Sequence, residues 1–168
     1  CLMPPESYHV TLRGLWVRKE FKSAAEYNQH NQAARAQLAR LDAELLANMP
    51  APTTTTFRMR TDTRDSHSTR RVELQPYDDQ AASMLKAAYQ RVCAAFPAPQ
   101  LPPPRWHMSI AYQAGGQRHV GSEALAGVMR SLPPVLTFAA PRVCEFVDMT
   151  RFVPVFDVTA DKKAQMTM

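Results

Sequence analysis

Two segments of the chain alternate between apolar and polar residues, and each carries a histidine at one of its polar positions. In residues 7–13, Val10 and Leu12 alternate with polar side chains, and residues 105–113 show a similar alternation. Side chains two positions apart on a β-strand point to the same face. Both segments are therefore predicted to be strands, with one face turned to a core and the other carrying the histidine.

Three other stretches have apolar residues at three- and four-residue intervals, which is the spacing of amphipathic helices. They cover residues 23–48, 78–96 and about 122–132. Ser23 and Glu26 form a capping box at the start of the first, because their side chains can satisfy free N–H groups of the first turn. Asp78 is the expected cap of the second.

Short alternating runs predict the remaining strands. They lie at residues 55–61, 69–75, 135–140, 142–149 and 152–159. A polar connection joins the first two, which predicts a hairpin. Because the strands are expected to be mainly antiparallel, the order of elements predicts an α+β fold rather than a doubly wound parallel sheet.

Residues 97–104 contain five prolines and predict an extended crossover between two similar halves, each of which opens with a histidine strand. A chain of 168 residues suits one domain. We therefore predict a single bilobal domain over residues 1–168 whose lobes divide at the crossover and are able to exchange strands.

Composition narrows the class of protein only slightly. The net charge of +5 and the isoelectric point near 9.4 favour an anionic partner. No apolar run approaches the ~20 residues that a membrane-spanning helix needs. The three cysteines are too few and too scattered for a disulfide framework or a zinc site. We expect a cytoplasmic, monomeric protein, although the start at Cys1 leaves room for a removed targeting segment.

The two histidine strands share one motif. Residues 8–12 and 106–110 both read aromatic, histidine, apolar, hydroxyl-bearing, apolar. His9 and Thr11 would share one strand face, as would His107 and Ser109. Such a pair suits phosphodiester chemistry, because a neutral imidazole can accept a proton while a protonated one donates to the leaving oxygen. Free histidine titrates near pH 6.5, so both forms are attainable near neutrality.

The hydroxyl groups of Thr11 and Ser109 would donate hydrogen bonds to the non-bridging phosphate oxygens. In a metal site those positions would carry carboxylates or further histidines. We therefore predict that His9, Thr11, His107 and Ser109 are catalytic and that no metal or cofactor takes part.

These motifs resemble the signature of the two-histidine (2H) phosphoesterase superfamily, which is two copies of histidine–any–threonine/serine–hydrophobic. Residues 4–8, 111–112 and 146–154 resemble an uncharacterised branch found in bacteria and protists. The resemblance implies two antiparallel sheets that face a central groove, with helices outside and pseudo-two-fold symmetry. It also implies activity on cyclic nucleotides or RNA 2′,3′-cyclic phosphates. Family members usually have a strand before the first motif, whereas here only eight residues precede His9.

Three more residues are candidates for substrate binding. Arg13 and Gln113 share strand parity with the histidines and are expected to line the groove. Tyr112 has core-facing parity, but an aromatic ring near a strand end can still stack on a base. His30, His67 and His119 have no partner motif and are expected to be solvated.

The predicted hairpin is rich in arginine. It carries Arg58, Arg60, Arg64, Arg70 and Arg71. These side chains are predicted to contact an RNA backbone. The alternative is a solvated edge where Asp62 and Asp65 offset part of the charge.

Three functions are compatible with these residues. The first is a metal-independent phosphodiesterase acting on a cyclic nucleotide or an RNA end. The second is a nucleotide- or RNA-binding module of the same fold that turns nothing over, although two intact proton-carrying motifs argue against a pure binder. The third is a scaffold that contacts RNA or protein, and the basic charge is the single feature that favours it.

Overall fold

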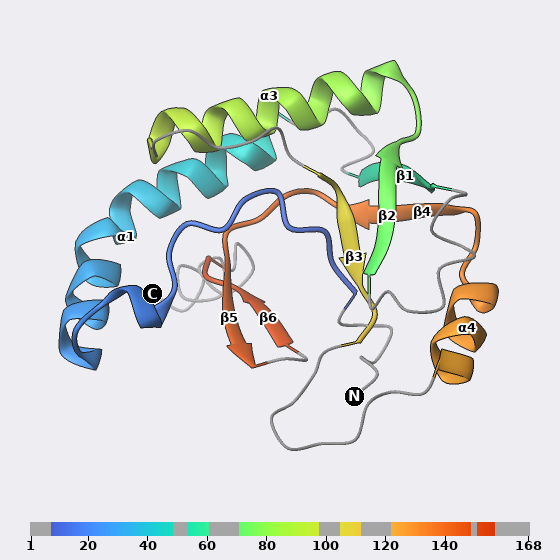
Figure 1. Cartoon of the computed structure of the whole chain (residues 1–168). Helices are drawn as coiled ribbons and strands as arrows, with labels where there is room; N and C mark the ends of the chain where they lie inside the picture. The colour runs from blue at the N-terminus through green and yellow to red at the C-terminus, as the bar shows by residue number, and fades with distance from the viewer. Residues whose placement is uncertain are drawn as a thin grey trace, which may run out of the picture.

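The computed structural model describes residues 8–48, 54–60, 71–97, 105–111, 122–148 and 151–156 (Figure 1). Its helical elements are the 3-10 turn η2 (Arg18–Glu20), α1 (Ala24–Ala47), α3 (Asp79–Ala95) and α4 (Ser122–Ser131). Its strands are β1 (Thr54–Met59), β2 (Arg71–Pro76), β3 (His107–Ser109), β4 (Val135–Ala139), β5 (Cys144–Asp148) and β6 (Arg151–Pro154). The predicted α+β class is confirmed.

The predicted caps start the two long helices. The Ser23 hydroxyl accepts a hydrogen bond from the Glu26 N–H at 3.1 Å, and the Glu26 carboxylate accepts from the Lys22 N–H at 2.9 Å. The Asp78 carboxylate accepts from the Ala81 N–H at 2.8 Å. Each bond satisfies a backbone donor that a helix start leaves unpaired.

A curled sheet of four antiparallel strands forms the centre of the fold, in the order β3-β2-β1-β4. The β1–β2 hairpin is the one that the sequence predicts. The strands β5 and β6 pair only with each other, as a separate hairpin with an irregularity between Phe146 and Asp148.

The first histidine segment is less regular than predicted. A strand is expected at residues 7–13. Among the described residues, this segment forms one antiparallel bridge, between Val10 and Met108. The strand β3, its neighbour, is three residues long, so it offers little backbone for pairing. Beyond Thr11 the chain leaves the sheet and runs toward the start of α1 (Figure 1).

Apolar side chains on one sheet face form the main core. Met108 and Ile110 are almost fully buried there, and Val10 and Leu12 pack against the same cluster, as their alternation predicts. Leu85 of α3 and Leu125 of α4 also join this cluster.

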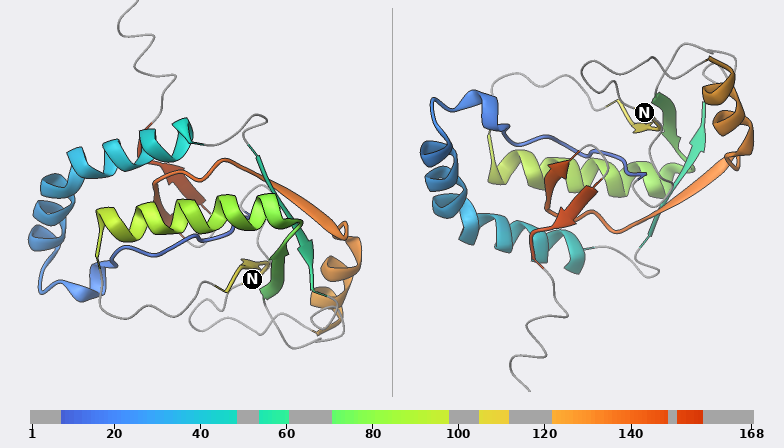
Figure 2. Two further views of the ribbon diagram at one scale, coloured as in Figure 1. Left: turned by 90° about the horizontal axis from the view of Figure 1, so that it is seen from above. Right: turned by 90° about the horizontal axis from the view of Figure 1, so that it is seen from below.

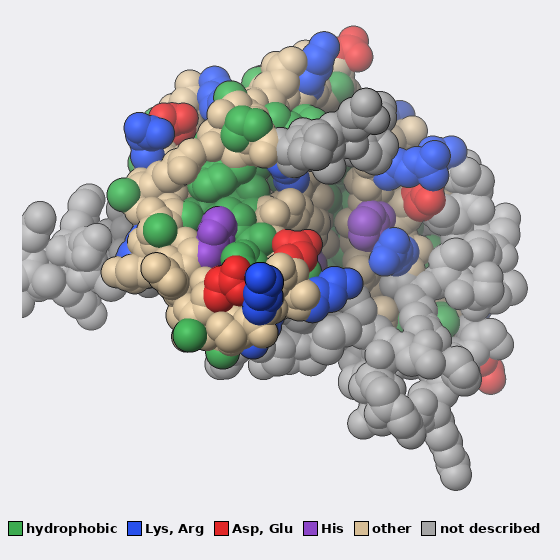
Figure 3. All heavy atoms as spheres, turned by 60° about the vertical axis from the view of Figure 1, so that its left-hand side comes forward, with side chains coloured by type: hydrophobic (Ala, Val, Ile, Leu, Met, Phe, Trp, Pro, Cys, Tyr) green, Lys and Arg blue, Asp and Glu red, His purple; other side chains and the backbone are tan. Residues whose placement is uncertain are grey.

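A second apolar cluster joins the two long helices. α1 and α3 lie side by side (Figures 1 and 2), and Leu41 of α1 and Val92 of α3 pack in one cluster with Val143. On another face of the molecule, hydrophobic side chains line a hollow whose rim carries basic and acidic groups (Figure 3).

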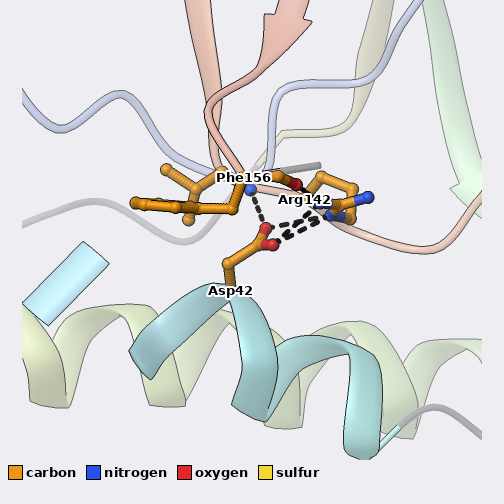
Figure 4. Close-up of polar contacts among 4 residues, drawn as sticks. Asp42, Arg142 and Phe156 are labelled. Atoms are coloured by element: carbon orange, nitrogen blue, oxygen red, sulfur yellow. Dashed lines mark hydrogen bonds and ion pairs between the residues drawn. The ribbon is translucent and has the colours of Figure 1, made fainter. Parts of the chain in front are cut away.

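A buried ion pair fastens α1 to the strands that follow β4. The carboxylate of Asp42, only 2% exposed, accepts hydrogen bonds from Arg142 Nε at 3.0 and 3.1 Å and from the Val143 N–H at 2.6 Å (Figure 4). The guanidinium of Arg142 also donates to the carbonyl of Phe156. A buried carboxylate needs such partners, because leaving water unpaired is costly. The sequence pattern does not predict this pair.

Both histidine motifs lie beside each other at one edge of the four-stranded sheet. The 2H resemblance implies two antiparallel sheets that face a central groove. Within the described residues the second sheet is the β5–β6 hairpin. None of the helices described is both long and apolar enough to cross a membrane.

Candidate functional site

The bridge between Val10 and Met108 sets the alignment of the two motifs. In an antiparallel pair with this register, His9 lies opposite Ser109 and Thr11 lies opposite His107. Residues that lie opposite each other point to the same face of the sheet. The four predicted catalytic residues are therefore brought together on one face, while Val10 and Met108 point into the core.

The two histidines occupy a diagonal of this four-residue group. Diagonal neighbours on an antiparallel pair are about 7–8 Å apart at the backbone, and their side chains approach more closely. A phosphate group fits between two imidazoles at such a separation. His9 and His107 are both half-buried, which leaves part of each ring open to solvent.

The strand β2 adds two charged residues to the same face. Its register with β3 places Arg71 opposite Ser109 and Glu73 opposite His107. One row across the sheet is therefore His9, Ser109 and Arg71, and the other is Thr11, His107 and Glu73. The Glu73 carboxylate also lies 3.7 Å from the Arg60 guanidinium.

Local contacts orient the His107 ring. Its Nδ1 lies 3.2 Å from the carbonyl oxygen of Arg105. If Nδ1 carries the proton and donates to this carbonyl, the other ring nitrogen, Nε2, is the atom that exchanges protons with a substrate. Ser109 is buried, whereas Thr11 is exposed.

Arg13 lies beyond the bridged part of the first motif, and it lines the same cavity as His9 and Thr11. Its Nε and Nη1 are buried without a hydrogen-bond partner. The pKa of Tyr89 on α3 is raised by burial and by Cys93 and lowered by the positive charge of Arg13. The positive charge of Arg13 therefore acts on Tyr89 of α3.

Tyr8 and Trp106 are placed as their parity predicts. Both pack against the main core. Burial raises the pKa of the Tyr8 phenol, so this group stays neutral at physiological pH. His30 is exposed, yet its ring contacts Trp16 at a centroid distance of 4.6 Å.

The predicted substrate-binding residues Tyr112 and Gln113 lie outside the described residues, as do Arg64, Arg70, His67 and His119. Of the other hairpin arginines, Arg58 donates to the carbonyl of Tyr77, and its guanidinium lies 5.0 Å from the centre of that ring. Arg71 is exposed next to the histidine motifs. The part of the chain that the structure describes contains no group of three or more metal-ligating side chains.

The sequence pattern does not identify Glu73 as a site residue, and it predicts Arg71 only as an RNA contact. Their own alternation with Val72 and Leu74 reveals which face they share, but not which residue of another strand they meet. That depends on the register of β2 with β3, for which the sequence contains no local signal.

No model of a known protein family, no curated protein and no solved structure matches this chain. The structure by itself defines an α+β protein with a curled antiparallel sheet, whose edge carries two histidine–hydroxyl pairs on one face.

Proposed function

We propose that this protein is a metal-independent phosphodiesterase of the 2H type, with His9 and His107 as its acid–base pair. The observation that carries the proposal is the antiparallel bridge between Val10 and Met108. It aligns two motifs that are about a hundred residues apart in the sequence, so that both histidines and both hydroxyl groups share one face.

The two histidines occupy matching positions on the diagonal of the four-residue group. Either imidazole can therefore serve as the base while the other serves as the acid. Glu73 opposite His107 and Arg71 opposite Ser109 place one negative and one positive charge beside the pair.

The reaction is the hydrolysis of a cyclic phosphate of a nucleotide or an RNA end. One histidine accepts a proton from water as the water oxygen forms a bond to phosphorus. The bond from phosphorus to one ribose oxygen breaks, and the other histidine gives that oxygen its proton, which leaves a phosphomonoester. Thr11 and Ser109 donate hydrogen bonds to the non-bridging oxygens, and Arg71 offsets their negative charge.

The wider 2H architecture is part of the same proposal. A second sheet that includes the β5–β6 hairpin would face the histidine-bearing face and close a groove over the phosphate. Arg58, Arg60 and Arg71 would then hold the backbone of an RNA substrate, with Arg58 and Arg60 also keeping their present contacts.

The decisive experiment measures turnover of the four 2′,3′-cyclic nucleotides and of an oligonucleotide with a 2′,3′-cyclic end, in EDTA. We expect cleavage by the wild type. His9→Ala and His107→Ala should each lower kcat by about 10²–10⁴-fold, because each removes a positioned acid or base. The double variant should lose less than the product of the two effects, because both groups act in one step.

His30→Ala is the matched control, since it removes a histidine from α1, away from the sheet face, and should leave turnover unchanged. A wild type that binds a cyclic nucleotide tightly but cleaves no diester between pH 5 and 8 would identify a binding module instead. Activity that is lost in EDTA and restored by zinc or manganese would overturn the metal-independent mechanism.

A further inference from the structure

A large cavity lies between the residue 8–18 segment, the helices α1 and α3, and the chain that joins β4 to β5. Its volume is about 1240 Å³, above the roughly 300–1000 Å³ that is usual for small-molecule sites. The partly exposed apolar part of its wall includes Leu12, Leu15, Trp16 and Phe138. The cavity is partly open to solvent and has room for a bound molecule.

Two polar side chains on the cavity wall have buried atoms without a partner. These atoms are Nε and Nη1 of Arg13 and the hydroxyl oxygen of Thr55, a residue that is only 3% exposed. Buried polar groups in native proteins nearly always find partners, so these groups indicate where the polar part of a ligand would bind. An N–H group of a guanidinium can donate a charge-assisted hydrogen bond to a carboxylate oxygen.

Other arginines on the wall already have partners. Arg142 pairs with Asp42, Arg18 donates to the carbonyl of Phe21, and Arg35 lies 5.6 Å from the centre of the Phe156 ring. Arg13 therefore supplies the positive charge that a ligand would use. One such charge in a mainly apolar space matches a ligand with a single negative charge and a long apolar body.

We propose that this cavity binds an amphipathic carboxylate, with its carboxylate group on Arg13 and its aliphatic chain along the partly exposed Leu12, Leu15 and Trp16. Thr55 supplies a hydroxyl to the polar part of the site. The inference goes beyond the phosphodiesterase proposal and does not depend on it. His9 and Thr11 also line the cavity but His107 does not, so the bound chain lies beside the first motif without bridging the two histidines.

The two tryptophans of the chain provide a direct readout, because both Trp16 and Trp106 line the cavity. The probe is bromine-substituted decanoate, whose bromine quenches tryptophan fluorescence on contact, and bromine-substituted 1-decanol is the uncharged comparison. We expect saturable quenching by the carboxylate and at least about ten-fold weaker binding of the alcohol, because the alcohol cannot form the charge-assisted bonds. Absence of saturable quenching, or equal affinity for both probes, would overturn the proposal.

Two substitutions then locate the site. Arg13→Gln should weaken decanoate binding by about ten-fold or more, and Thr55→Val should weaken it to a lesser extent. Arg35→Gln is the matched control, since it alters an arginine of the same wall that already contacts Phe156, and binding should persist. A folded Arg13→Gln protein, checked by circular dichroism, that binds decanoate like the wild type contradicts the assignment. If the Arg13→Gln protein does not fold, the comparison of bromine-substituted decanoate with bromine-substituted 1-decanol on the wild type tests the proposal.

Discussion

Glu73 is placed beside the histidine motifs by its cross-strand neighbour, His107. It is half-buried, lies opposite His107 and also approaches Arg60. Its carboxylate contacts no substrate in the proposed mechanism. We propose Glu73 as a positioning residue, which acts on the His107 ring from the neighbouring strand.

Replacing Glu73 with glutamine keeps the size of the side chain and removes its charge. We expect kcat for a 2′,3′-cyclic nucleotide to fall by roughly ten-fold, in line with a charge interaction of about 1–2 kcal/mol, while KM changes little. Glu73→Asp should restore part of the loss. Lys86→Gln serves as the control, since it removes an exposed charge from α3, and it should leave kcat unchanged. A Glu73→Gln variant with wild-type kcat would show that His107 does not depend on this carboxylate.

At the scale of elements, the ends of the helices are fixed by short-range chemistry. Asp78 starts α3 by accepting a hydrogen bond from the Ala81 N–H, and α3 in turn contributes Leu85 to the main core and Val92 to the second cluster. The same helix therefore supports the sheet that carries both histidine motifs.

Removing this cap should weaken the fold by a predictable amount. Asp78→Ala should lower the free energy of unfolding by about 1 kcal/mol, because the first turn of α3 loses a partner for one N–H group. Gln80→Ala, at an exposed position of the same first turn, should change it by less than about 0.5 kcal/mol. Urea denaturation of the two variants measures the difference. Equal stability of both would show that the cap contributes little here.

At the scale of the whole molecule, Asp42 and Arg142 join segments that are far apart in the sequence. Their ion pair connects α1 to the residues between β4 and β5, and Arg142 continues the connection to Phe156 (Figure 4). The pair lies next to the second apolar cluster through Val143, whose N–H donates to Asp42.

Breaking this pair should be more costly than losing a cap. Asp42→Ala leaves the partly buried guanidinium of Arg142 and the Val143 N–H without their acceptor, so the free energy of unfolding should fall by about 3–5 kcal/mol. Glu44→Ala, an exposed carboxylate on the same helix, should have little effect. Chemical denaturation tests both. A loss below about 1 kcal/mol for Asp42→Ala would mean that the pair is solvated in solution.

Local chemistry determined much of this protein. Periodicity gave the α+β class and the approximate bounds of α1, α3 and α4 and of the β1–β2 hairpin. It also identified which side chains of the two motifs join the main core, namely Val10, Leu12, Met108 and Ile110. It did not predict the burial of Ser109 between Met108 and Ile110. The caps at Ser23 and Asp78 could be predicted from the sequence, because each cap bond joins residues three positions apart.

The tertiary structure decided what depends on register and on distant contacts. Parity predicts that Arg13 shares a strand face with His9, but the strand pairing described for this segment is a single bridge at Val10. Only the tertiary structure places Arg13, His9 and Thr11 on the wall of one cavity. The meeting of Glu73 with His107 depends on how β2 and β3 align, and the pairing of Asp42 with Arg142 joins residues a hundred positions apart. A single sequence determines which residue types can form such contacts, whereas the packing of whole elements determines which of them meet.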